Sequence, residues 1–309
     1  MEPNKHQIKI GPEFFAKAAN DYNCWIWAIV REFFQNCIDC GSSRIDISIT
    51  ENSGKTFVVF SNDGEAMTKE ILVNKLLALG ASGKTDRSGD SVGGFGKAKE
   101  ILYFMHEHYV IRSGQWLVSG SGAEYELEEQ VEFHHGTRST VQIDEDVVEK
   151  LCDMVKRYVS MLQWKGTVTL NHEQLDCRLI KGFRRKEDSF GVVYTNRTFS
   201  RTMIVRINDV PMFHDWVSCD GCVLVELSSD SLDCLTSNRD SLKGDTRWNM
   251  QRFVNQLAAD KMSALRDVEP RYTHFAGETL SFSIETESKS VTEIIQEPCE
   301  VTVTDQDGN

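Results

Sequence analysis

Residues 23–40 read NCWIWAIVREFFQNCIDC, and this stretch decides the fold. The pattern predicts a helix of about five turns, with Asp21 or Asn23 as its N-cap and Gly41 ending it at C′. Apolar residues occur on almost every side of the helix, so most of it must be buried. One stripe is nevertheless polar, because residues three and four apart share a face. Its members are Glu32, Gln35, Asn36 and Asp39. The stripe is either the solvent-exposed edge of a core helix or part of a functional site.

The composition predicts a globular protein. The 309 residues allow two domains, or one domain with an appendage, and 40% are hydrophobic and 26% charged. No apolar run of about 18 residues occurs, and the N-terminus MEPNKHQIKIGPE is too polar for a signal peptide. We therefore expect a cytoplasmic protein that does not enter a membrane. A net charge of −13 argues against nucleic-acid binding over the whole surface, and the basic segment 181–186 (KGFRRK) is interpreted as a solvated turn.

Two CxxC pairs, Cys37/Cys40 and Cys219/Cys222, raise the possibility of zinc. The two pairs are far apart in the sequence, and the first lies within the apolar helix. Nine cysteines is also an odd number, which argues against a disulfide framework. Buried, reduced thiols are the simpler expectation.

Alternating and helical patterns predict an α+β first domain. The expected strands form a hairpin with its turn at 52–54, four further antiparallel strands, and a last hairpin that turns at Asn171 and His172. They span residues 44–50, 55–61, 108–112, 115–119, 125–133, 137–143 and 167–179. Two further helices are expected: 68–79, capped by Thr68 and stopped by Gly80, and 144–163.

Residues 80–100 read GASGKTDRSGDSVGGFGKAKE and predict a mobile loop that ends in the glycines of GGFG. A helix over 97–105 should follow. A glycine-rich turn before a helix N-terminus presents unpaired backbone N–H groups, which favour phosphate. The segment GASGKT, 80–85, is not a P-loop, because it has two residues between its glycines where four are needed, and it follows a predicted helix instead of a strand. The segment GFGKAK, 94–99, is not a dinucleotide fingerprint, because it has lysine where the third glycine is needed.

A second domain should begin near 181–189. Its expected strands are 190–195, 203–208 and 222–227, followed by a polar loop over 228–244 and a helix over 245–266. The chain then becomes acidic and loses helical periodicity, and we expect disorder over 279–309. The predicted division is 1–182 for the first domain, 183–268 for a smaller α/β domain, and 269–309 for an acidic tail.

Four motifs in this order resemble the GHKL superfamily, named for gyrase, the ninety-kilodalton heat-shock chaperone, histidine kinases and MutL. They are ExxxN on the buried helix, NDGEAM after a strand, the glycine-rich loop ending in GGFG, and Gly136-Thr137 at the start of a strand. The resemblance covers residues 25–143. It implies the Bergerat fold, an α/β sandwich with helices on one face of a mixed, mostly antiparallel sheet, which binds ATP and Mg²⁺ beneath a flexible lid.

The resemblance also implies roles for individual residues. Glu32 matches the general base that orients the attacking water, Asn36 matches the magnesium ligand, and Thr137 matches the threonine near the adenine. Residues 80–92 match the lid, in which Lys84 is a candidate nucleotide contact. The turn whose amides hold the phosphates is matched by Gly93, Gly94, Phe95, Gly96 and Lys97. A base and a metal ligand four positions apart are what phosphoryl transfer to water requires.

The adenine-reading motif departs from the family pattern, which is DxGxG. Aligning Gly64 and Met67 places Asn62 at the aspartate position and Ala66 at the second glycine. Either Asn62 accepts from the adenine amino group, or the loop shifts so that Asp63 does. Both residues stay candidates, and Gly64 and Met67 are candidate nucleotide contacts in the same motif.

A cation from the second domain completes the site in several members of the superfamily. The segment SLDCLTSNRDSL, 231–242, looks like the chaperone's middle-domain loop. Arg239 matches the arginine that reaches the γ-phosphate there, where it would stabilise developing charge. Lys243 is the reserve candidate, because gyrase and MutL use a lysine.

These residues favour a chaperone-like or clamp-like ATPase. Hydrolysis of Mg-ATP would drive lid closure, docking of the second domain and nucleotide-dependent homodimerisation, and it would act on an unknown protein or DNA client. The alternative is a nucleotide-gated binding module with little or no hydrolysis, which Asn62 and Ala66 allow. A histidine kinase fits poorly, because His6 is the only phosphoacceptor candidate before the helix and its segment is too polar for a packed helix pair.

Overall fold

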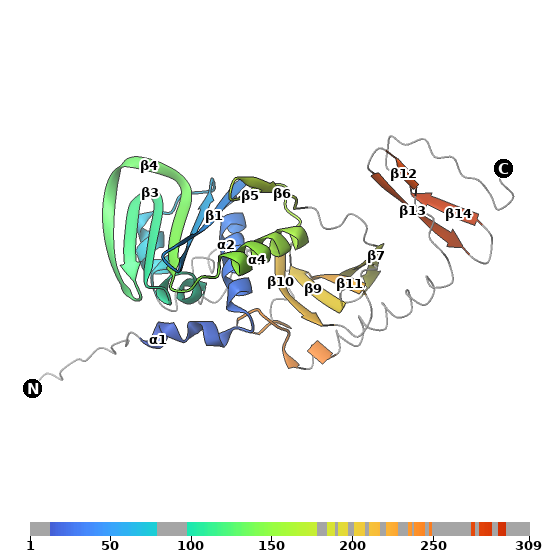
Figure 1. Cartoon of the computed structure of the whole chain (residues 1–309), viewed down its shortest axis with the longest axis horizontal. Helices are drawn as coiled ribbons and strands as arrows, with labels where there is room; N and C mark the ends of the chain where they lie inside the picture. Colours follow the sequence, from blue (N-terminus) through green and yellow to red (C-terminus); the bar gives the residue numbers. More distant parts are fainter. Residues whose placement is uncertain are drawn as a thin grey trace, which may run out of the picture.

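The computed structural model of the chain (Figure 1) describes two long stretches and a series of shorter ones. The described residues are 13–78, 98–177, 184–188, 191–196, 201–207, 210–216, 221–227, 234–236, 238–244, 247–248, 273–275, 278–285 and 290–294. Side chains are described for the first two stretches from residue 14 onward, and for most residues between 201 and 248.

The central helix is α2, Trp25–Asp39. It follows two short helical turns, α1 (Glu13–Ala16) and η1 (Ala18–Asp21). Gly41 lies just beyond its end at φ +74°, as expected for a glycine at C′. The predicted N-cap is wrong, because Cys24 occupies that position and makes no side-chain capping bond. The N–H of Asn23 is bound instead by the carboxylate of Asp240, 217 residues away.

The main sheet has six strands in the order β3-β4-β2-β1-β5-β6. Only the β1–β5 pair is parallel, so the sheet is mixed and mostly antiparallel. The strands are β1 (Arg44–Asn52), β2 (Lys55–Asn62), β3 (His108–Ser121), β4 (Glu124–Ile143), β5 (Thr167–Leu170) and β6 (Glu173–Leu175). Both predicted hairpin turns are confirmed by left-handed residues, Ser53 and Gly54 in the first and Asn171 and His172 in the second.

Strands β3 and β4 are longer than the sequence predicted. Four short strands were expected, but each predicted pair forms one continuous strand. The ladder between β3 and β4 shifts register on either side of Gly114. Gly114 and Gly136 both have positive φ, +57° and +72°, so these glycines bend the strands without ending them.

Helices cover one face of this sheet. α2 packs beside α4 (Val148–Met161), with η3 (Glu100–Phe104), α3 (Lys69–Ile71) and η2 (Leu72–Leu76) nearby. The two predicted helices on either side of the glycine-rich loop contain π-helical turns at η2 and η3. Thr68 caps α3 as predicted, because its hydroxyl accepts from Ile71 N at 3.3 Å.

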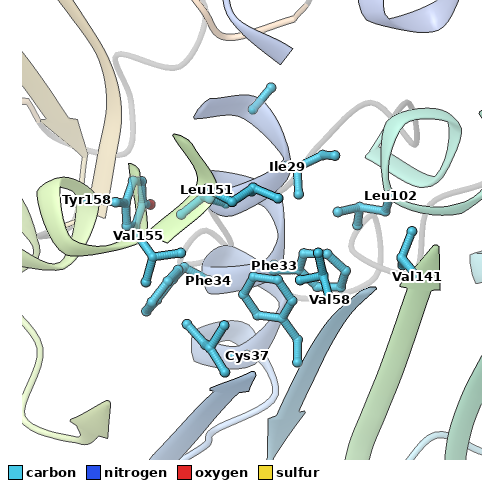
Figure 2. Packing of buried hydrophobic residues seen from close by; sticks show 14 of the residues in the cluster. Ile29, Phe33, Phe34, Cys37, Val58, Leu102, Val141, Leu151, Val155 and Tyr158 are labelled. Carbon is cyan, nitrogen blue, oxygen red and sulfur yellow. The ribbon is translucent and has the colours of Figure 1, made fainter. Parts of the chain in front are cut away.

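Aromatic and aliphatic side chains of α2 join helices and sheet into one core (Figure 2). Phe33 stacks on Phe60 of β2 with ring centroids 3.9 Å apart, and Phe34 meets Tyr158 of α4 at 5.0 Å. Each such ring contributes roughly 2–3 kcal/mol when it is fully buried. The predicted α+β fold, with helices on one face of a mixed sheet, is therefore confirmed.

A second sheet has the order β10-β9-β11-β8-β7. Its strands are β7 (Arg184–Asp188), β8 (Gly191–Asn196), β9 (Arg201–Ile207), β10 (Val210–Trp216) and β11 (Gly221–Leu227). Three were predicted, but β10 was missed. The expectation of a solvated turn over 181–186 is wrong for its last three residues, which begin β7.

Three strands also occur where the sequence predicted an acidic, disordered tail. They are β12 (Thr273–Phe275), β13 (Glu278–Glu285) and β14 (Ser290–Ile294). In β13, Leu280, Phe282 and Ile284 alternate with polar residues, a period-two pattern that outweighs the acidic composition. Most of the predicted helix 245–266 lies outside the described residues. The proposed domain boundaries stay predictions.

Gly136→Ala should destabilise the fold much more than Gly54→Ala. Both glycines have positive φ, but a Cβ at Gly136 would lie 1.9 Å from the carbonyl oxygen of Asn62, whereas a Cβ at Gly54 meets nothing within 4 Å. Left-handed strain alone costs about 1 kcal/mol at Gly54, and overpacking raises the cost at Gly136 to about 3 kcal/mol or more. Urea denaturation followed by circular dichroism measures both. Equal losses would contradict the close packing at Gly136.

Candidate functional site

Two of the four residues in the polar stripe of α2 are buried. Glu32 is 9% exposed and Gln35 only 1%, while Asn36 and Asp39 are partly exposed. The amide of Gln35 donates to the Met212 sulfur, and its Oε1 is buried without a hydrogen-bond partner. A carboxylate is rarely buried without a specific partner, so the stripe is more than the wet edge of a core helix.

The partner of Glu32 is its neighbour in sequence, Arg31. The guanidinium of Arg31 is fully buried and donates to Glu32 Oε1 from Nη2 at 2.7 Å and from Nε at 3.2 Å. Both bonds reach the same oxygen, so Oε2 stays outside this ion pair. Sequence reasoning missed Arg31, although an arginine inside an otherwise apolar helix was a visible signal.

Arg31 also connects α2 to the second sheet and to the polar loop that follows it. Its Nη1 donates to the carbonyl oxygens of Met212 at 3.2 Å and Arg239 at 2.9 Å, and its Nη2 donates to that of Asn238 at 2.8 Å. Trp27, one turn earlier, donates from Nε1 to the same Met212 oxygen at 2.8 Å. One face of α2 is therefore hydrogen-bonded to β10 and to the polar loop that carries Arg239.

The structure brings Arg239 next to this helix. Arg239 is only 6% exposed and has φ +55°, which is rare for a residue with a side chain. Burial lowers the pKa of its guanidinium, and the negative charge of Glu32 is the strongest influence that opposes the shift. The geometry agrees, because Arg31 donates both to the Glu32 carboxylate and to the Arg239 carbonyl. The reserve candidate, Lys243, is exposed.

Tyr22 is a further neighbour that the sequence did not indicate. Burial, and then the charge of Glu32, raise the pKa of its phenol. Its hydroxyl therefore stays protonated and can donate hydrogen bonds at neutral pH.

The other end of the candidate site lies on the sheet, where three polar residues stand in a row. Thr137 of β4 is paired with Asn62 of β2 on one side and with Ser113 of β3 on the other. The Ser113 hydroxyl accepts from Met67 N at 2.8 Å, donates to the carbonyl of Gly136 at 2.8 Å, and is 2.9 Å from the Thr137 hydroxyl. Sequence reasoning missed Ser113, which fixes two predicted site residues, Met67 and Thr137.

The alternatives Asn62 and Asp63 have different surroundings. The Asp63 carboxylate accepts from the backbone N–H groups of Ser43 and Arg44, both at 2.8 Å, so it holds the start of β1. The side chain of Asn62 turns toward α2, where its Nδ2 is 3.4 Å from Cys37 Sγ and its Oδ1 accepts from Gly64 N at 3.1 Å. Asn62 is thus the residue of the two that faces the helix layer.

Gly64 is required by close packing. A Cβ at this position would lie 2.3 Å from the Cys40 sulfur and 2.7 Å from the Ser42 hydroxyl. The adjacent N–H of Glu65 donates to the Cys40 carbonyl at 2.8 Å, which joins the loop after β2 to the end of α2. Gly64 therefore allows the loop carrying Asn62 to approach the helix.

The predicted phosphate turn and lid lie outside the described residues. These comprise Lys84, Gly93, Gly94, Phe95, Gly96 and Lys97. On the flanks of this segment, the buried ammonium of Lys99 donates to the carbonyl oxygens of Lys75, at 2.6 Å, and of Ala78. Burial lowers the pKa of Lys99 to about 8. Lys99 therefore holds together the two ends of the segment.

The described cysteines are free thiols, including Cys37 and Cys40. Burial raises the pKa of Cys37 to about 12, which disfavours the thiolate that metals bind. Among residues whose positions are described, no group of three or more His, Cys, Asp or Glu side chains is arranged to hold a metal ion. Cys219 and the side chain of Cys222 lie outside that part of the chain.

The fold was compared with known proteins. The ATPase region of Saccharomyces cerevisiae topoisomerase II bound to ICRF-187 (dexrazoxane) is 12% identical, with a TM-score of 0.44, and the match covers 60% of this chain and 62% of that one. A second structure of the same region is 13% identical, with a TM-score of 0.47, and covers 67% and 75%. The chain thus spans less than two thirds of the first of these structures. No protein-family model and no curated protein sequence matches.

The described helices were also tested for the ability to cross a bilayer. None of them has both the length and the apolar character that this requires.

Arg31→Leu should destabilise the protein strongly. The substitution leaves Glu32 buried without its cation and removes the donor to three carbonyl groups, and breaking a buried ion pair costs about 3–5 kcal/mol. Arg44→Leu is the matched control, because it breaks the exposed ion pair with Asp46 and should change stability little. Thermal denaturation measures both variants. Similar melting temperatures for the two would contradict the structural role of Arg31.

Proposed function

We propose that the chain binds ATP with Mg²⁺ between α2 and the β2–β4 end of the main sheet, and that it hydrolyses the nucleotide. The observation that carries the proposal is the buried carboxylate of Glu32, which is held by Arg31, the same guanidinium that donates to the backbone carbonyl of Arg239. A buried acid, one oxygen of which stays outside its ion pair, suits a residue that orients water. An adjacent buried arginine suits the transferred phosphoryl group.

The oxygen donors of α2 fit magnesium. Asn36 lies one turn after Glu32 on the same face and is partly exposed. Its amide oxygen, a hard ligand of the kind that magnesium prefers, would therefore lie next to the proposed base. Magnesium usually takes few protein ligands and keeps several waters, so a single asparagine is sufficient. When bound, the ion would neutralise charge on the phosphate oxygens.

The nucleotide base would lie at the row of polar residues on the sheet. Asn62 and Thr137 are paired across β2 and β4, and Ser113 fixes the Thr137 hydroxyl. An amide oxygen and a hydroxyl can accept from and donate to an adenine edge. Because the Asp63 carboxylate is turned to the start of β1 whereas the Asn62 side chain faces the helix layer, Asn62 is the better candidate for reading the adenine.

The second domain would act through Arg239. Arg239 is buried near Glu32 whereas Lys243 is exposed, so Arg239 is the better candidate for the γ-phosphate. Closure of the lid, residues 80–92, over the nucleotide and dimerisation of the chain are further parts of the proposal. The resemblance of the motifs supports both, and Lys99 supports the first, because it joins the parts of the chain on either side of the glycine-rich loop. A protein or DNA client would be moved by these changes.

A second candidate function is nucleotide-gated binding with little hydrolysis. The specific observation in its favour is that Asn62 and Ala66 stand where the family pattern has its aspartate and its second glycine. The two candidates predict the same nucleotide affinity and different turnover.

Glu32→Gln separates the two functions. The substitution keeps the shape and removes the charge, so it should lower phosphate release by about 100-fold or more while the Kd for ATP stays within about threefold. Malachite-green phosphate assays and fluorescence titration with a labelled ATP analogue measure the two quantities.

Glu107→Gln is the matched control, because Glu107 is an exposed carboxylate paired with Lys55 away from α2. It should retain wild-type turnover. Undiminished hydrolysis by the Glu32 variant would contradict its assignment as the base. Binding by the wild type without turnover would favour the second function.

A further inference from the structure

The tip of the polar loop that carries Arg239 is tightly folded. Leu235 and Leu242 form a bridge and are buried in the core of the second domain. Between them, Thr236 N donates to the Ser241 carbonyl at 2.9 Å, and Arg239 N donates to the Thr236 carbonyl at 2.9 Å. The loop is therefore anchored at its base, and it presents residues 238–240 at its tip.

This tip is bound to the beginning of α2 by two residues that flank Arg239. Asn238 Nδ2 donates to the Asp21 carbonyl at 2.5 Å, and Asp240 Oδ2 accepts from Asn23 N at 2.9 Å. The backbone carbonyls of Asn238 and Arg239 accept from Arg31 further along the helix. Both sides of Arg239 are thus fixed to the first domain.

Arg239 needs such support because its backbone is in a left-handed conformation at φ +55°. A residue with a side chain rarely adopts this conformation unless its surroundings impose it. Asp240 supplies two restraints at once, since its Oδ1 accepts from the Thr236 hydroxyl at 3.0 Å and its Oδ2 accepts from Asn23 N. Oδ1 therefore stabilises the fold of the loop, and Oδ2 binds the loop to the segment just before α2.

We propose that Asp240 is a positioning residue for hydrolysis, which sets the Arg239 guanidinium beside Glu32 by fixing the loop tip to the start of α2. The inference rests on the proposed function, because it assigns Asp240 to the same reaction. Asp240 acts through Arg239 and does not contact the nucleotide. It should therefore affect turnover and leave nucleotide binding unchanged.

The test is a double-mutant cycle measured by single-turnover phosphate release. Asp240→Ala should lower the rate about tenfold, the effect of losing hydrogen bonds to a charged group. The Kd for ATP should stay within about threefold. Asp240→Asn keeps one acceptor oxygen and should recover part of the loss. In an Arg239→Ala background, Asp240→Ala should change the rate by less than about twofold, because residues that act as a unit are not additive.

Asp46→Ala is the control, since Asp46 is likewise a carboxylate that accepts hydrogen bonds from two residues, Arg44 and Thr169, but lies on β1 away from the loop. It should leave turnover unchanged. Equal effects of Asp240→Ala in both backgrounds, or a wild-type rate in Asp240→Asn and Asp240→Ala alike, would overturn the inference while leaving the ATPase intact. A wild-type protein that binds no ATP and releases no phosphate would overturn the proposed function together with it.

Discussion

The buried ion pair of Arg31 and Glu32 is the interaction on which the rest of the structure depends. Two neighbouring residues of one helix are both removed from water, at a desolvation cost that only close pairing offsets. The remaining donors of Arg31 meet the carbonyl groups of Met212, Asn238 and Arg239. The same guanidinium therefore pairs with the carboxylate and holds β10 and the Arg239 loop against α2.

This ion pair explains how one helix can contribute to the hydrophobic core and also carry residues of the candidate site. Phe33 and Phe34 face the sheet and α4, while Arg31, which holds Glu32, faces β10 and the Arg239 loop. The apolar face fixes the position of the helix through close packing. The polar face can then hold a charge in a defined place, which a solvent-exposed loop could not do. The side chains that pack the core and the side chains of the candidate site thus lie on different faces of α2.

Local patterns allowed much of the fold to be predicted from the sequence. The boundaries of α2, its glycine stop and both hairpin turns follow from periodicity and turn chemistry. The N-cap was missed because the group that binds Asn23 N belongs to Asp240, far along the chain. The continuous course of β3 and β4 was missed because glycines that usually end strands here form bends within them. Both errors arise from tertiary contacts, which no local pattern contains.

The candidate site likewise combines residues that could be proposed from the sequence with residues that only the structure reveals. Glu32 and Arg239 were proposed from the resemblance, and in the structure both accept hydrogen bonds from Arg31. Arg31 and Ser113 were not identified, because each acts by fixing another residue and neither forms part of a recognisable motif. The choice between Asn62 and Asp63 also needed the structure, which shows the Asp63 carboxylate bound to the start of β1. Supporting residues of this kind become visible only when distances are known.

The most direct test of the central claim is a crystal structure with Mg²⁺ and a non-hydrolysable ATP analogue. The account predicts the γ-phosphate between Glu32 and Arg239, a metal ion on Asn36, and a water within about 3 Å of the Glu32 carboxylate. A nucleotide bound away from α2, or a γ-phosphate that neither Glu32 nor Arg239 approaches, would contradict it.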